Sequence, residues 1–173
     1  MKLKFAAVVG IAVTGAYEHT IRMQGKGQPI TAVIEMGRFP GIVLAVRKEK
    51  AAQVKSFKDL KGFVAYAKAN PGKINFAVAS GASSQFLAER LVRTLDVDVT
   101  FIGMKGGAEA ASATLGGHTD MFFSTTGMKP NVDSGKLLAL ASSGKERWKP
   151  FAGAPTFRES GVPVIYAASY HLI

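Results

Sequence analysis

Two loops rich in small residues contain the groups of this chain that are best suited to bind a ligand. The first comprises Ser80, Gly81, Ala82, Ser83 and Ser84, and the second comprises Lys105, Gly106, Gly107 and Ala108. Each loop follows a short apolar run and precedes a helical pattern, which predicts that each lies at the N-terminus of a helix. The first N–H groups of a helix have no partner within it, and the helix dipole adds partial positive charge there. We therefore expect the two loops to hold a small anion, such as a carboxylate, with backbone N–H groups and serine hydroxyls.

A second interpretation treats these loops as ordinary strand-to-helix turns, in which Ser83 or Ser84 only caps the following helix. The ends of the next apolar run supply further candidates: Asp120 stands at its start, and Ser124 and Thr125 stand at its end. Asp120 is expected either to lie near the ligand or to bond a neighbouring loop. Ser124 and Thr125 are expected to line the pocket.

Catalytic and metal-binding chemistry have little support in the sequence. There is no cysteine, and the three histidines, His19, His118 and His171, are far apart, so neither a thiolate nucleophile nor a zinc site is expected. The first loop resembles part of a nucleophile elbow, but Gln85 stands where the second glycine of that motif belongs. The sequence therefore predicts no catalytic residue, no metal and no cofactor.

The charge of the chain favours anionic partners. Its 173 residues carry a formal net charge of +10. The lysines and arginines are scattered rather than gathered in a stripe that alternates with aromatic residues, so nucleic acid is not the expected partner. A positive field that attracts small anions agrees better with this pattern.

Alternating strand and helix patterns predict how the candidate residues are positioned. Strands are expected at residues 8–16, 30–36, 42–47, 74–79, 97–103, 120–124 and 137–142, and helices at 17–24, 56–69, 84–95 and 108–115. Ser56 is the expected N-cap of the second helix, residues 37–41 are an expected turn, and Trp148 is expected to pack beneath an irregular segment. This alternation is typical of an α/β fold with a mostly parallel sheet and flanking helices. In such a fold the strand-to-helix loops meet at the carboxyl edge of the sheet, where ligands bind.

The two ends of the chain leave alternatives open. Residues 1–16 combine a basic start with an apolar run, which suits either a signal segment or the first strand of the domain. Residues 164–168 form an apolar run close to the end, which indicates a truncated or incomplete domain. An apolar face exposed where a second lobe is absent would favour a chain that binds no ligand, with a homodimer that covers this face.

A series of motifs runs through the last two-thirds of the chain. The motifs lie at residues 63–74 (FVAYAKANPGKI), 81–84, 87–89, 105–110, 115–124, 134–141 and 154–161. In this order and spacing they resemble the periplasmic receptors of tripartite tricarboxylate transporters, the Bug-type receptors. Residues 16–24, 36–47 and 58–62 are instead similar to binding proteins of nitrate, sulfonate and taurine ABC transporters and to thiamine-precursor-binding relatives. These resemblances divide the chain into residues 1–16, an ABC-receptor-like portion at 17–62 and a Bug-receptor-like α/β lobe at 63–173.

Both resemblances imply the type II periplasmic-binding-protein fold, in a partial version that is either truncated or a mosaic. They imply a periplasmic solute-binding protein, not an enzyme, that captures a small carboxylate or related organic anion. They also imply a membrane permease as partner, from a tripartite tricarboxylate or an ABC transporter, and a ligand-binding role for both loops. The alternatives are an enzyme or thiamine-precursor-binding protein of the same fold, which would use Glu18 and His19, and a receptor fragment that binds no ligand.

Overall fold

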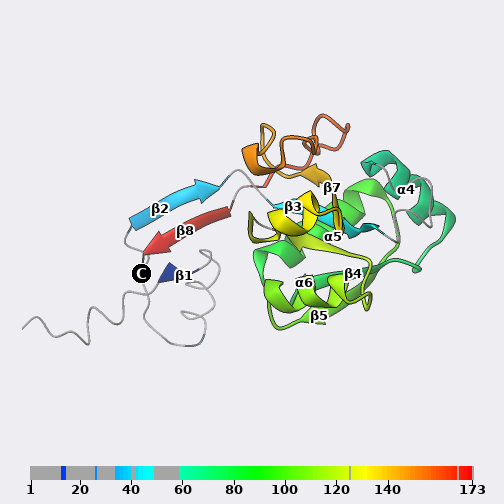
Figure 1. Cartoon of the computed structure of the whole chain (residues 1–173), viewed down its shortest axis with the longest axis horizontal. Coiled ribbons are helices and arrows are strands. Elements are labelled where there is room, and N and C mark those ends of the chain that lie inside the picture. Colours follow the sequence, from blue (N-terminus) through cyan, green and yellow to red (C-terminus); the bar gives the residue numbers. More distant parts are fainter. Residues whose placement is uncertain are drawn as a thin grey trace, which may run out of the picture. The chain divides into compact units, whose positions relative to one another are not determined.

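The computed structural model describes residues 13–14, 26, 34–39, 42–48, 59–124, 126–166 and 168–172, which belong to two units (Figure 1). The first unit comprises Met1–Phe39 and Ala167–Ile173, and the second comprises Pro40–Tyr166. β3 (Val43–Arg47) is a strand of the second unit's sheet. The division at residues 16 and 62 that the resemblances suggested stays a prediction.

The described part of the first unit is a small antiparallel sheet with the strand order β1-β8-β2. Its strands are β1 (Val13–Thr14), β2 (Ile34–Phe39) and β8 (Ala168–Leu172). The turn predicted at residues 37–41 begins too early, because β2 continues as far as Phe39, which pairs with Ala168. The helix predicted at residues 17–24 lies outside the described residues.

The second unit contains a five-stranded sheet with the strand order β5-β4-β6-β3-β7. Besides β3, its strands are β4 (Asn75–Ala79), β5 (Thr100–Met104), β6 (Met121–Ser124) and β7 (Leu137–Ser142). β4 pairs in parallel with β5 and β6, whereas β3 is antiparallel to β6 and β7. Within this sheet, four strands therefore run in one direction and β3 runs against them. The predicted α/β fold with a mostly parallel sheet is confirmed, and the reversal of β3 is a feature that the sequence pattern did not show.

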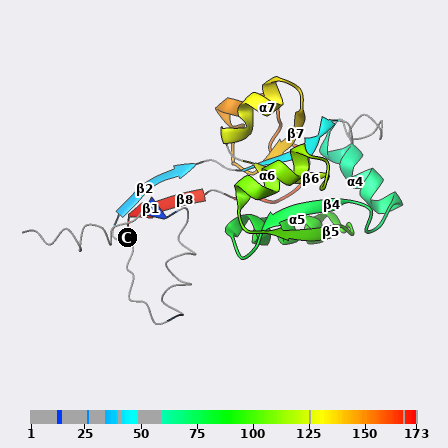
Figure 2. The ribbon, with the colours of Figure 1, turned by 60° about the horizontal axis from the view of Figure 1, so that its bottom comes forward.

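Helices flank this sheet (Figure 2). They are α4 (Leu60–Ala69), α5 (Ser83–Leu95), α6 (Gly107–Leu115) and the short α7 (Lys129–Asp133), with 3-10 turns η1 (Thr126–Met128) and η2 (Lys149–Phe151). α4 begins at Leu60, where the side chain of Asp59 accepts a hydrogen bond from the Gly62 N–H at 2.8 Å and caps the helix. Ser56 itself lies outside the described residues.

Alternating side chains of the strands build a core on each face of the sheet. Phe76 and Val78 of β4 belong to a buried cluster that also contains residues of α4 and α5. Ala77, which lies between them in β4, belongs to a different cluster together with Ala110 of α6. Because neighbouring residues of a strand point to opposite faces, α4 and α5 cover one face and α6 covers the other. The two helices that follow the candidate loops, α5 and α6, thus leave the sheet on opposite sides.

The irregular segment after β7 is held by packing and by local hydrogen bonds. Trp148 is 7% exposed, and its ring centroid lies 5.4 Å from that of Phe151, which confirms the predicted packing role. Glu159 accepts hydrogen bonds from the Thr156 N–H at 2.6 Å and from Nε of Arg147 at 3.0 Å. These two bonds lower the pKa of the Glu159 carboxyl group below its ordinary value.

Candidate functional site

The carboxyl end of β4 lies at a topological switch point of the sheet, because the strands that follow β4 in the chain are added on both of its sides. β4 connects through α5 to β5 on one side, and β5 connects through α6 back across β4 to β6 on the other side. Open α/β sheets bind ligands at such a switch point, outside the carboxyl ends of the strands. The first loop follows β4 here, and Ser124 ends the adjacent parallel strand β6. The structure therefore brings the first loop and Ser124 to the same edge, as the sequence predicted.

The first loop leads into α5 without a side-chain cap. The N-cap of α5 is Ala82, which makes no side-chain hydrogen bond. The interpretation of Ser83 or Ser84 as the N-cap is therefore wrong, because both serines lie inside the first turn of the helix. Gly81 has a φ of 67°, a left-handed conformation that favours glycine, and its N–H donates to Oε1 of Gln85 at 2.6 Å. The loop thus presents two serines of a helix start at a partly exposed edge of the sheet.

The second loop differs from the first in the charge at its helix terminus. The N-cap of α6 is Gly106, again without a side-chain hydrogen bond. The Lys105 N–H donates to Oε2 of Glu109 at 2.6 Å. A carboxylate of the chain itself therefore lies at the start of α6, where an anionic ligand would otherwise be stabilised. Gly107 and Ala108 are exposed, but we expect this loop to hold an anion less well than the first.

The two loops are neighbours. The Ser80 N–H donates to the carbonyl oxygen of Met104, at the end of β5, with a distance of 2.9 Å. A Cβ atom added at Gly103 would lie only 2.7 Å from Oγ of Ser80, so a larger residue there would displace the Ser80 hydroxyl of the first loop. Because the loops are neighbours, the charge of Glu109 in the second loop can change the affinity of a ligand bound to the first loop.

Asp120 lies at the edge of the sheet opposite to the first loop, so its contact with a ligand stays a prediction. It is 5% exposed, and its Oδ2 accepts a hydrogen bond from the Asn75 N–H at 2.9 Å, at the start of β4. The length of β4 separates this edge from Ser80, a span of about 15 Å at the usual rise of a strand. The alternative expectation, that Asp120 bonds a neighbouring backbone segment, is confirmed. The signal was already in the sequence, because a residue that precedes a parallel strand must lie at the amino edge of the sheet.

The substitution Asp120→Asn should lower the free energy of unfolding by about 1–3 kcal/mol, because it replaces a charge-assisted hydrogen bond at a buried position by a neutral one and places an NH2 group there. We expect the affinity for a carboxylate ligand to stay unchanged. Denaturant unfolding and ligand titration of the same variant check both statements. A loss of affinity without a loss of stability would return Asp120 to the ligand site.

Tyr166 is a site residue that the sequence did not indicate. Its hydroxyl donates a short hydrogen bond to Oγ of Ser83. The backbone of Tyr166 is held by Ser143, which accepts the Tyr166 N–H with its carbonyl oxygen at 2.8 Å and donates its hydroxyl to the Tyr166 carbonyl oxygen at 3.0 Å. Tyr166 and Ser83 are 83 positions apart, so no local pattern could have paired them.

The substitution Tyr166→Phe should weaken carboxylate binding by roughly three- to tenfold, since loss of a hydrogen bond of about 0.5–1.5 kcal/mol leaves Ser83 less firmly oriented. Ser83→Ala should then weaken binding less in the Tyr166→Phe background than in the wild type, which a double-mutant cycle of dissociation constants measures. Tyr66→Phe, which removes a hydroxyl from α4, is the matched control and should leave affinity unchanged. Additive effects of Tyr166→Phe and Ser83→Ala would contradict the coupling.

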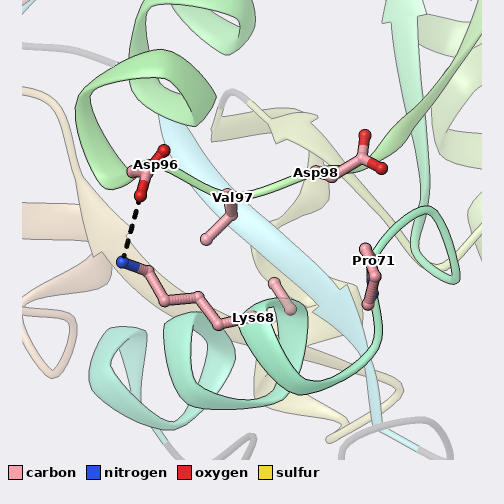
Figure 3. Close-up of a pocket in the computed structure, with 6 residues that line it drawn as sticks. Lys68, Pro71, Asp96, Val97 and Asp98 are labelled. Atoms are coloured by element: carbon pink, nitrogen blue, oxygen red, sulfur yellow. Dashed lines mark ion pairs between the residues drawn. The ribbon is translucent and has the colours of Figure 1, made fainter.

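A pocket of about 400 Å³ lies away from the candidate loops, between the ends of α4 and α5 (Figure 3). Its lining comprises Ala67, Lys68, Pro71, Asp96, Val97 and Asp98. Nζ of Lys68 lies 3.6 Å from Oδ2 of Asp96, and both side chains are largely exposed. Exposed ion pairs contribute little to stability. The pocket contains none of the residues that the sequence predicted for the site.

Some of the predicted site residues lie outside the part of the chain that the structure describes. Thr125 and the segment around Glu18 and His19 lie outside the described residues. Within the described residues, no group of three or more histidine, cysteine, aspartate or glutamate side chains is placed to hold a metal ion. Among the helices described, none has the length and apolar character needed to cross a bilayer.

Comparison with known proteins identifies the family of this chain. The family model described as tripartite tricarboxylate transporter family receptor, TctC, matches residues 19–171. Since the match spans most of the chain, the chain belongs to this family, as the resemblance to Bug-type receptors predicted. The match also runs through most of the portion at 17–62 whose motifs are similar to ABC-transporter receptors.

Individual relatives agree with this assignment. The "UPF0065 protein in gbd 5'region" of Cupriavidus necator is 32% identical over 117 residues, which cover 67% of this chain and 36% of that protein. MatC (Rpa3494) from Rhodopseudomonas palustris, solved with bound malate, is 28% identical with a TM-score of 0.73, over 82% of this chain and 47% of MatC. This chain therefore spans less than half of the length of either relative.

The fold extends to receptors of ABC transporters. The periplasmic aliphatic sulphonate binding protein SsuA from Escherichia coli has a TM-score of 0.54 at 18% identity, over 92% of this chain and 43% of SsuA. This similarity supports the predicted periplasmic-binding-protein fold. The family and these structural neighbours are solute-binding proteins of transport systems.

Proposed function

We propose that this chain is part of a solute receptor in which residues 80–84 hold the carboxylate group of a small organic anion. One observation carries the proposal: α5 begins at the switch point of the sheet with Ala82 as N-cap and with Ser83 and Ser84 in its first turn. The neutral side chain of Gln85 bonds Gly81 and orders the loop without bringing a negative charge to the helix terminus. The net charge of +10 adds a favourable long-range field for an anion.

Capture of this kind needs no covalent step. The Ser84 N–H and the hydroxyls of Ser80, Ser83 and Ser84 would donate to the carboxylate oxygens, and Ser124 would line the same edge. Hydrogen bonds to a charged group contribute roughly 1.5–3 kcal/mol each. Three of them would contribute about 4.5–9 kcal/mol, from which the free-energy cost of immobilising the ligand is subtracted.

We further propose that the receptor acts in the periplasm and delivers its solute to the membrane permease of a tripartite tricarboxylate transporter. Family membership and the malate bound by MatC support this partner and a carboxylate solute. An ABC-type permease is the alternative, supported only by the fold shared with SsuA. Closure of a second lobe over the solute would shift the population toward the form that the permease recognises.

Calorimetric and thermal-shift titrations with malate test the proposal, with the uncharged diamide of malate as the control. We expect malate to stabilise the native state by an amount that grows with its concentration, about 2.7 kcal/mol at one hundred times the dissociation constant. The same assay then ranks mono-, di- and tricarboxylates and sulfonates. A cooperative melt that no carboxylate shifts would show a folded lobe that does not bind this class of solute.

A further inference from the structure

In both candidate loops, a side chain of the first helical turn accepts a hydrogen bond from the loop backbone, but this side chain is neutral in one loop and charged in the other. In each loop, the side chain of the third helical residue accepts a hydrogen bond from the N–H of the residue before the N-cap. In the first loop the acceptor is the amide oxygen of Gln85 on Gly81, and in the second it is the carboxylate of Glu109 on Lys105; both distances are 2.6 Å. Glutamine and glutamate have nearly the same shape, so the two loops differ at this position mainly by one negative charge.

The residue of the first loop that is equivalent to Glu109 is the neutral Gln85. Glu109 is exposed and lies at the helix start next to the loop that we assign to the ligand, since Ser80 bonds Met104 across β4 and β5. On the side of the first loop, the carboxylate of Glu89 lies one turn further along α5 and accepts a hydrogen bond from Nε2 of Gln85 at 2.8 Å. Lys105 adds one exposed positive charge beside Glu109. The helix start beside the first loop therefore carries a neutral amide at α5, whereas α6 carries the carboxylate of Glu109 with the ammonium group of Lys105 nearby.

We propose that Glu109 is a specificity-determining residue that limits the negative charge of the ligand. This inference rests on the proposed function of the first loop. Because β4 and β5 are neighbouring strands, a carboxylate bound there would lie on the order of 10 Å from Glu109, about two strand spacings. At that distance a second negative charge on the ligand lowers affinity by roughly two- to tenfold. The ligand class is therefore a carboxylate whose remaining polar groups are uncharged or are hydrogen-bond donors toward α6.

Exchange of the two side chains tests the proposal. The probes are malate and its monoamide, which share a carbon skeleton and differ by one negative charge. Glu109→Gln keeps the hydrogen bond to Lys105, as Gln85 does for Gly81, and should improve the affinity for malate roughly two- to tenfold more than the affinity for the monoamide. The difference should shrink at high salt, because screening weakens interactions between exposed charges. Gln85→Glu should weaken the binding of both probes.

The outcomes separate the inference from the function on which it rests. If the wild type binds neither probe, the proposed function fails and the inference fails with it. If the wild type binds and Glu109→Gln leaves the affinity ratio of malate to monoamide unchanged, only the inference fails. An affinity ratio that shifts toward malate in Glu109→Gln, with an unchanged melting temperature, supports both.

Discussion

The substitution Ser84→Asp should weaken carboxylate binding by at least about fivefold and should not lower the stability of the protein. Ser84 lies in the first turn of α5, where a carboxylate side chain interacts favourably with the helix dipole by about 0.3–1 kcal/mol. The same carboxylate would stand beside the bound anion, and two like charges about 4 Å apart repel by about 1–4 kcal/mol, depending on how well water screens them. Stability and affinity therefore move in opposite directions, which a misfolded variant cannot imitate.

The matched control for Ser84→Asp is Ala108→Asp, at the equivalent position in the first turn of α6. It adds the same charge to a helix terminus that already carries Glu109. We expect it to weaken binding far less than Ser84→Asp does. Titration calorimetry gives the dissociation constants, and thermal unfolding gives the stabilities. If Ala108→Asp has the larger effect on affinity, the ligand is bound by the second loop.

The substitution Phe76→Ala should cost about 3–5 kcal/mol of unfolding free energy, the usual effect of removing a buried phenylalanine ring. Phe76 is fully buried in β4, and its ring centroid lies 5.6 Å from that of Phe101 and 5.4 Å from that of Phe123. These contacts connect three neighbouring strands, β5, β4 and β6, beneath the first loop. For a chain of this size we expect the melting temperature to fall by roughly 10 °C.

The control for Phe76→Ala is the same substitution at Phe86, whose side chain belongs to α5 and whose residue is 62% exposed. Exposed substitutions of this kind change stability by about 0.5 kcal/mol or less. Denaturant unfolding of both variants, with equal slopes, measures the difference. Equal losses for the two variants would contradict the core that we describe.

Local signals were enough to predict most of the elements that carry the site. The apolar runs and helical patterns from residue 42 onward correspond to β3 to β7 and to α5 and α6. These patterns depend on periods of 2 and 3.6 residues, which a chain shows before it folds. The position of a small-residue loop between a strand and a helix follows from the same patterns, so residues 80–84 could be proposed as a ligand loop from the sequence. The resemblance to Bug-type receptors added the family, which the comparison confirmed.

Which of the candidate residues meet was decided only by the tertiary structure. The order β5-β4-β6-β3-β7 places Ser124 beside the first loop and Asp120 at the other edge. The bond from Tyr166 to Ser83 joins residues that are distant in the chain. Such contacts arise from the pairing of strands and the packing of segments, which no local period encodes. The charge difference between the two loops likewise became visible only when the side chains of Gln85 and Glu109 were seen to return to the backbone before their helices.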